Sequence, residues 1–436
     1  MIYAKDVKRS VGFLSLRKKE SLSYPKKHWE VLNRIDVKMR IDKFIAFIFC
    51  VSLRILQNEI RNVASTIFPI EAHAREFGST TIGVITGMPD VVGFFTLFML
   101  PRFVTKNNEA KLVAIGGIGS GISVTMFGLA YYSVKSVTFA VFSSMAMLSF
   151  GFFGSFIIGC AYSLASSIFP KRRIEIASAL QISIGIGSAG GLIFGGLLYS
   201  LVGYSFTFII PGITFVITAM LFLISFFTLK DNNSSTKSEI VDKASIIRFA
   251  KNQHALALGI PLLITGLHMG LRNTAFAVYA NQKYGFNGEE VSYIYSCRPI
   301  FYIIFSFVNS FLAKMGYSPH MLCYSVFIYA IQAFLFYIPE IFPLIGTKLY
   351  FSMVLIVNGY AWSFVQAPFY NVIEWICTVK STSNANKLIF ASWYAIIIVI
   401  GNVLGCVVFG GVLVDHIGFT FTNLTNLNEA LQLTCC

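Results

Sequence analysis

Eight side chains that could carry chemistry lie inside apolar stretches of this sequence. They are charged, titratable or amide residues set among Phe, Leu, Ile, Val and Gly: Arg54, Asn58, Glu59, Asp90, His268, Arg272, Asn273 and Arg298. An ionisable group at membrane depth is costly, so it normally faces a cavity or a partner. We therefore expect these eight residues to contact a small-molecule substrate.

Asp90 is the strongest single candidate among them. It follows Pro89, and a proline weakens a helical turn by removing one backbone hydrogen bond. A lone carboxylate in such a turn could bind a cationic group or exchange a proton. The competing interpretation is structural, namely an ion pair with Arg54 or Arg298.

Two arginines, Arg272 and Arg298, stay protonated at any usable pH. They could contact an anion, or they could be permanent partners of Glu59 and Asp90. Arginines outnumber acids among the candidates. An organic anion or a zwitterion therefore fits them as well as a cation does.

The other basic residues have weaker claims. His268 can exchange protons near neutral pH, although a single membrane histidine is more often a hydrogen-bonded packing residue. Arg61 and Arg75 are expected nearer the outer surface, where long basic side chains can reach water.

The composition indicates an all-α polytopic membrane protein. The chain has 436 residues, of which 56% are hydrophobic and only 12% are charged. An ordinary soluble domain has about twice this charged fraction. The apolar runs are repeatedly about 20 residues long, which is enough to cross a bilayer as a helix.

Polar stretches divide the chain into five parts. We expect a basic tail over 1–43, a six-helix bundle over 44–229, a linker over 230–254, a second bundle of five spans over 255–418 and a polar tail over 419–436. The chain would thus have about eleven transmembrane helices. A twelfth would begin near Phe419, but the residues there are too few and too polar to span, so we expect it to be missing.

The distribution of charge indicates the orientation of the chain. The net charge of +14 comes largely from the N-terminal tail and from alternate loops, as expected for a multi-pass protein with a cytoplasmic N-terminus. Its surroundings would be a lipid bilayer, of a vesicle, an organelle or the plasma membrane, and not nucleic acid. The eight cysteines form no metal or redox motif, so no cofactor, metal or enzymatic activity is expected.

Two glycine-rich runs contain residues that recur along one helix face. Their spaced glycines are Gly187, Gly191, Gly195 and Gly196 in the first run, and Gly401, Gly405, Gly410 and Gly411 in the second. Small residues on one face let helices approach closely in a bilayer. An offset of 215 residues carries Gly195 onto Gly410, Gly203 onto Gly418 and Asn58 onto Asn273. Such an echo is typical of transporters built from two related halves, and it would make Asn58 and Asn273 face each other.

These patterns resemble the major facilitator superfamily. The first glycine run is similar to its fifth-helix antiporter motif, with Gly191, Gly195 and Gly196 matching and Leu192 in the place of a proline. More narrowly, residues 67–72 (IFPIEA) and 79–87 (STTIGVITG) resemble the vesicular amine transporter family and, within it, the polyamine-transporting branch.

The resemblance implies a two-bundle fold that moves a small organic solute by alternating access, with proton coupling. The two glycine helices would be the close-packed faces that slide. The family holds cationic substrates on intramembrane acids, but here Glu374 and Asp415 lie toward the ends of the tenth and eleventh spans. The substrate therefore stays open between an amine or polyamine and another organic ion.

A second function class stays open beside the transporter. A non-transporting sensor or scaffold on a truncated transporter fold would also lack a twelfth helix. The loop at 102–111 keeps basic residues but starts without the glycine and the acid of the superfamily pattern, which is compatible with that alternative.

Overall fold

The computed structural model describes residues 26–100, 108–168, 173–230, 253–312, 315, 318–342, 346–379, 396–419 and 422. Most of the expected linker over 230–254 and of the two expected tails, over 1–43 and 419–436, lies outside these residues, as does most of the loop at 102–111. Every element within the described ranges is helical. The all-α class expected from composition is thereby confirmed.

The first half of the chain forms a bundle of long helices. They are α2 (Lys26–Ala74), α3 (Ser79–Met99), α4 (Glu109–Leu129) with a 3-10 turn η2 (Ala130–Tyr132), α5 (Ser136–Ile168) and α6 (Arg173–Lys230). α6 contains two of the expected spans, because Gly203 interrupts its helical path with a φ of 77°. α2 begins at Lys26, well before the expected first span.

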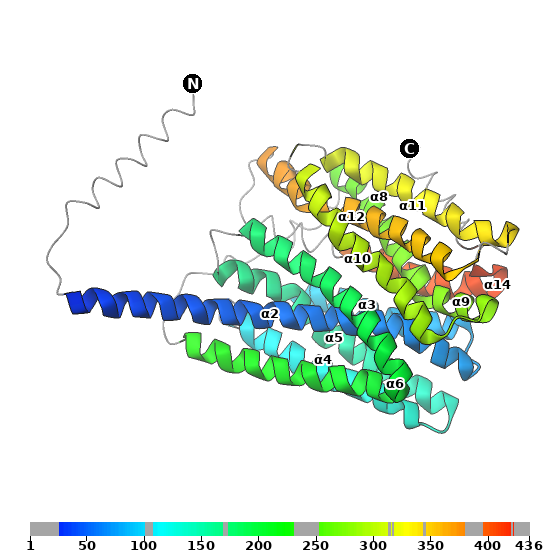
Figure 1. Cartoon of the computed structure of the whole chain (residues 1–436), viewed down its shortest axis with the longest axis horizontal. Helices are drawn as coiled ribbons and strands as arrows, with labels where there is room; N and C mark the ends of the chain where they lie inside the picture. The colour runs from blue at the N-terminus through cyan, green and yellow to red at the C-terminus, as the bar shows by residue number, and fades with distance from the viewer. Residues whose placement is uncertain are drawn as a thin grey trace.

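The second half is built from shorter pieces. They are α8 (Gln253–Leu271), the π-helical segment η3 (Arg272–Phe276), α9 (Ala277–Tyr284), α10 (Gly288–Leu312), α11 (Ser318–Ile341), α12 (Lys348–Val379), and a last helix, Ile396–Ile417, that includes η6 (Gly405–Leu413) and α14 (Val414–Ile417). We call this last element helix 396–417. In Figure 1 the helices of the first half lie together along one side, and those of the second half lie along the other.

The helices fit a multi-pass membrane protein. Among the described residues, seven helical stretches are long and apolar enough to cross a membrane, and one of them, Ile182–Phe226, has 45 residues. A stretch of that length, broken at Gly203, is enough for two crossings. Helix is present in each of the eleven stretches expected to span, whereas most residues of the expected twelfth lie outside the described part.

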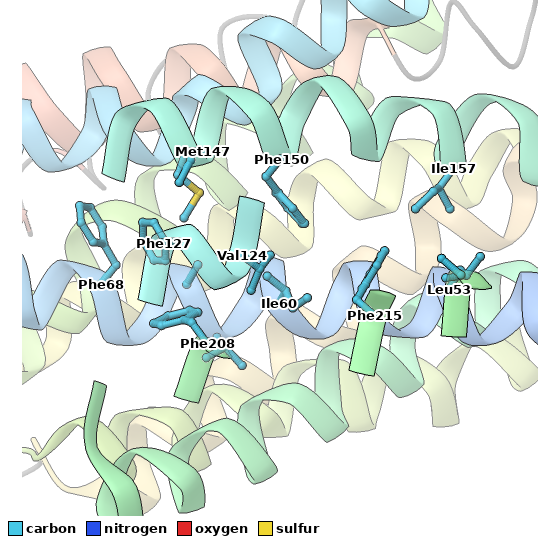
Figure 2. Close-up of a cluster of buried hydrophobic side chains, with 14 of the residues drawn as sticks. Leu53, Ile60, Phe68, Val124, Phe127, Met147, Phe150, Ile157, Phe208 and Phe215 are labelled. Atoms are coloured by element: carbon cyan, nitrogen blue, oxygen red, sulfur yellow. The ribbon is translucent and has the colours of Figure 1, made fainter. Parts of the chain in front are cut away.

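Aromatic side chains join the helices of the first half. The ring of Phe127 in α4 meets Phe208 in α6 edge to face, with centroids 4.8 Å apart, and Phe68 in α2 at 5.4 Å. Figure 2 shows these rings between the three helices. Aromatic pairs of this kind add about 0.5 to 1.5 kcal/mol beyond the burial of their surface. They fix α2, α4 and α6 as one packed unit.

The first glycine run packs mainly within its own half. A Cβ atom added to Gly187 would lie 2.2 Å from the carbonyl oxygen of Ile55, and one added to Gly191 would lie 2.6 Å from Cα of Glu59. Gly195 faces Val63 in the same way. The face with a period of four is therefore the contact surface of α6 with α2.

The second glycine run repeats this arrangement. Cβ atoms added to Gly401 and Gly405 would lie 2.4 Å and 2.3 Å from carbonyl oxygens of α8, and one added to Gly410 would lie 2.9 Å from Cβ of Thr274 in η3. Two other glycines contact the opposite half. Gly196 faces Ser292 of α10, and Gly411 faces Thr80 of α3.

The two halves also share an unusual backbone conformation. Gly203 and Gly418, which the offset of 215 residues makes equivalent, have φ values of 77° and 81°. This region is open to glycine and strained for other residues. The matched conformations support the internal repeat expected from the sequence.

Candidate functional site

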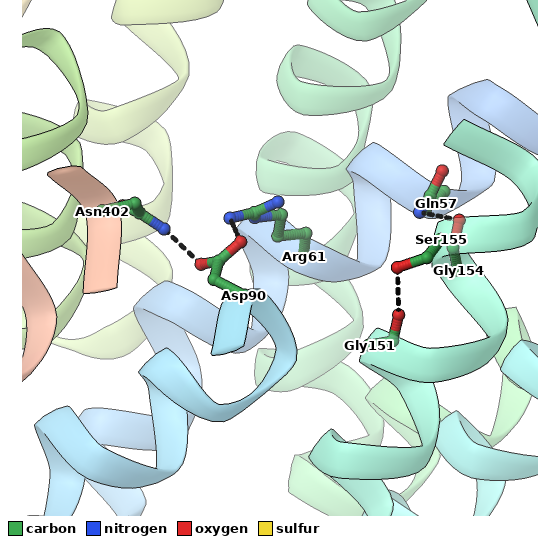
Figure 3. Close-up of polar contacts among 7 residues, drawn as sticks. All are labelled: Gln57, Arg61, Asp90, Gly151, Gly154, Ser155 and Asn402. Atoms are coloured by element: carbon green, nitrogen blue, oxygen red, sulfur yellow. Dashed lines mark hydrogen bonds and ion pairs between the residues drawn. The ribbon is translucent and has the colours of Figure 1, made fainter. Parts of the chain in front are cut away.

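Asp90 is held by one residue from each half of the molecule. Its carboxylate is 4% exposed and pairs with the guanidinium of Arg61 in α2. Its second oxygen accepts a hydrogen bond from the amide of Asn402 in helix 396–417. Figure 3 shows both contacts meeting at the carboxylate. The competing interpretation, an ion pair of Asp90, is thus present, with Arg61 as the partner in place of Arg54 or Arg298.

Arg61 reaches Asp90 because both residues lie at a similar depth. Ala74 and Ser79 end and begin neighbouring helices. Arg61 is 13 residues before the first and Asp90 is 11 residues after the second. These separations correspond to about 20 Å and about 16 Å of helix. The expectation that Arg61 lies nearer the outer surface did not anticipate this contact.

Arg54, Asn58 and Glu59 occupy adjacent turns of α2. Arg54 donates to Oε1 of Gln57 at 2.9 Å, and Asn58 donates to the carbonyl oxygen of Arg54 at 2.8 Å. The backbone of Glu59 is covered by Gly191. These contacts hold Arg54 and Asn58 against their own helix.

Arg298 lies in α10 and is 1% exposed. Its Nη2 donates to Oδ1 of Asn62 in α2 at 3.1 Å, and its Cζ lies 5.2 Å from the ring centre of Trp362 in α12. Its Nε and Nη1 have no hydrogen-bond partner among the described residues. Arg298 is therefore a buried cation held by one amide and one aromatic face.

Arg272 opens the π-helical segment η3 and is also 1% exposed. Its Nε donates to the carbonyl oxygen of His268 at 2.9 Å, while its Nη1 has no partner in the described part of the chain. The hydroxyl of Tyr295 donates to the carbonyl oxygen of Arg272 at 2.5 Å. The ring of His268 stacks on Tyr329 with centroids 5.0 Å apart.

Of the two roles open to Arg272 and Arg298, permanent pairing with Glu59 and Asp90 is absent from the described residues. The described ion pairs involve other residues, and of these acids only Asp90 takes part, with Arg61. The two arginines instead contact a backbone carbonyl, an amide and a tryptophan. Neither arginine therefore forms an ion pair with a described carboxylate.

Three cavities meet at the Asp90–Arg61 pair. Each is lined by both residues, and their cavity volumes are about 30, 90 and 80 Å³, which is room for a few water molecules. One of them brings together the expected residues Asn58, Asp90, Asn273 and Arg298. A second adds Arg54. The expectation that Asn58 and Asn273 face each other agrees with their place in one cavity.

Three expected residues, Glu59, His268 and Arg272, line none of these three cavities. Other lining residues were missed by the sequence analysis: Arg61, Asn62, Trp362 and Asn402. Each is a polar or aromatic residue within an apolar run, which is the signal that could have identified them. The arrangement offers an ion pair that a proton could break, buried cations and a flat aromatic wall.

The sequence of this chain matches a known protein family. The sequence profile of the Major Facilitator Superfamily matches residues 47–374. Over 157 residues the chain is 25% identical to the MFS-type transporter SLC18B1 of Rattus norvegicus, a match that covers 35% of this chain and 33% of that protein. The chain thus spans about a third of the length of this curated relative. The match supports the resemblance to vesicular amine transporters.

Solved structures share the fold. A bacterial homologue of the human lysosomal transporter Spinster, inward-facing and unoccupied, has a TM-score of 0.65 at 14% identity, with 90% of this chain and 94% of that chain covered. The nucleoside transporter NupG has a TM-score of 0.66 at 14% identity, with 89% and 97% covered. At such identities the likeness concerns the fold alone.

Proposed function

We propose that this chain, which belongs to the Major Facilitator Superfamily, is a proton-coupled secondary carrier that moves a small organic ion through the central cavity. The observation that supports this most directly is the position of Asp90. Its carboxylate lies in the cavity wall and is bonded to a cation of its own half and to an amide of the other half. A proton bound there would act on both halves.

The coupling step follows from the chemistry of a carboxylate. Protonation removes the negative charge that holds Arg61, and it weakens Asp90 as an acceptor for Asn402. Because the bond to Asn402 crosses between the halves, proton binding would change how the halves are held together. Alternating access would then be a shift between two arrangements of the halves around the cavity.

A non-transporting sensor or scaffold is the second candidate. One observation favours it: both oxygens of Asp90 are already occupied by protein groups. A carboxylate in a fixed structural pair would hold the halves together without exchanging protons. Such a protein would bind a solute without moving it.

Uptake into sealed vesicles distinguishes the two candidates. The purified chain in proteoliposomes, with an imposed pH gradient, would be offered labelled spermidine, serotonin and a panel of organic anions. The carrier accumulates one of these solutes, and the accumulation collapses when a protonophore removes the gradient. Binding without accumulation would favour the sensor, and the absence of both from folded protein would contradict the carrier.

A further inference from the structure

Arg298 and Arg272 are buried cations whose charges are not neutralised by any described side chain. Each is 1% exposed, and each lies within electrostatic reach of the other. Two buried like charges repel, and a buried charge normally requires a counter-ion. One amide, one carbonyl and an aromatic face compensate only part of this cost.

Arg298 lines the cavity that contains Asp90. A guanidinium has five N–H groups in a planar fork, and here Nε and Nη1 have no described partner. The fork matches the two oxygens of a carboxylate or a phosphate. Arg298 therefore offers an unused anion contact in the cavity wall.

The same cavity has two further features that a ligand would use. Trp362 stacks on Tyr302 with centroids 4.1 Å apart, which holds its ring in place, and its Nε1 has no described partner. The Oδ1 atoms of Asn273 and Asn402 also lack a described partner. A flat group could lie against the indole, and an N–H or O–H group could donate to these amide oxygens.

We propose that Arg298, backed by the positive charge of Arg272, holds the anionic group of the transported solute, which is a small organic anion with a flat portion and a hydrogen-bond donor. This assignment rests on the proposed carrier function and specifies its substrate class. It places the solute's charge in the second half and leaves Asp90 free to exchange the proton. The bound anion would supply the missing counter-charge for Arg298.

Binding to purified protein in detergent tests the assignment separately from transport. The probes are 4-aminobenzoate, phenyl phosphate, spermidine and 4-aminobenzamide, the last being a neutral isostere of the first. Titration calorimetry should show a preference for 4-aminobenzoate over 4-aminobenzamide of about tenfold or more, as expected for a charge-assisted pair. Phenyl phosphate distinguishes a phosphate site from a carboxylate site.

Arg298→Gln should abolish the preference for the anion, and Arg272→Gln should reduce it. Arg298→Lys keeps the charge without the fork and should bind the anion more weakly than the native protein. Lys348→Gln, which removes a half-exposed cation paired with Glu290, is the matched control and should bind like the native protein. Ligand-free Arg298→Gln should melt at the same or a higher temperature, because it no longer buries an uncompensated charge.

Several outcomes would overturn the assignment. They are equal binding of the amide and the carboxylate, binding of spermidine in place of the anions, or an unchanged preference in Arg298→Gln. If anions bind in detergent but no solute accumulates in vesicles, the carrier proposal fails, and Arg298 is supported as an anion-binding residue only. If spermidine accumulates with the pH gradient and anions do not bind, the carrier function is supported, and the assignment of an anion site to Arg298 is contradicted.

Discussion

Asp90 of α3 and Asn402 of helix 396–417 are joined by a hydrogen bond that crosses from one half of the molecule to the other. The same carboxylate pairs with Arg61 inside its own half. A single buried group therefore links the charge balance of one half to the position of the other.

The pairing of Arg61 with Asp90 predicts a strong coupling between the two positions. Arg61→Gln leaves a buried carboxylate without its cation and should destabilise the protein by about 1 to 3 kcal/mol. The double variant Arg61→Gln, Asp90→Asn removes both charges and should recover most of this loss. Thermal melting of the four proteins in detergent gives the coupling energy. Simple additivity of the two effects would contradict a direct pair.

Close packing of α6 on α2 predicts opposite effects for two neighbouring glycines. In Gly187→Ala the added carbon would lie 2.2 Å from a backbone carbonyl oxygen, whereas in Gly190→Ala its nearest neighbour would be Phe194 at 3.9 Å. The first change should destabilise by about 1 to 3 kcal/mol through overpacking. The second should be neutral or stabilise by up to about 1 kcal/mol, because alanine favours helix.

Melting temperatures and the yield of monodisperse protein measure this difference. A Gly187→Ala protein as stable as Gly190→Ala would show that the contact between α2 and α6 is looser than described. Gly405→Ala, whose added carbon would lie 2.3 Å from a carbonyl oxygen of α8, should behave like Gly187→Ala. The two halves would then share the same packing requirement.

Asp415 of α14 forms a second link between the halves, at the start of α3. Its carboxylate accepts hydrogen bonds from the backbone N–H groups of Ser79 at 3.0 Å and Thr80 at 2.8 Å, and from the hydroxyl of Thr80 at 2.5 Å. A carboxylate in this position satisfies helix N–H groups that have no partner in their own helix. Asp415→Ala should therefore let this end of the molecule open more often.

Pulsed electron paramagnetic resonance measures this opening as the distribution of distances between spin labels at the exposed residues Glu76 and His416. Asp415→Ala should increase the population at longer distances. Glu289→Gln is the control, because Glu289 bonds to Tyr293 within α10 alone and should leave the distribution unchanged. An unaltered distribution in Asp415→Ala would show that other contacts keep this end closed.

The sequence predicted the features that depend on periodicity. Apolar runs of spanning length located the helices, and glycines at a spacing of four identified two closely packed faces. The equivalence of Gly203 and Gly418 could be read from the repeat because both positions require a conformation that glycine tolerates.

The partners of the charged residues could not be predicted in the same way, because they depend on how the helices are arranged in space. The sequence analysis expects Arg61 nearer the outer surface, whereas the structure pairs it with Asp90. Counting residues from the turn between α2 and α3 would have placed Arg61 at the depth of Asp90. Asn402 gave no comparable signal, because a single amide in an apolar helix does not indicate which of the other helices it contacts.

The role of Asp90 in coupling is tested most directly by the dependence of uptake on a pH gradient in the native protein and in Asp90→Asn. The substitution keeps the size of the side chain and removes its ability to exchange a proton. Native protein in sealed vesicles should accumulate its labelled solute only while the gradient exists. Asp90→Asn, inserted and folded to the same extent, should lose this gradient-driven accumulation by about tenfold or more. Equal gradient-driven accumulation by the two proteins would contradict the role of Asp90 in coupling.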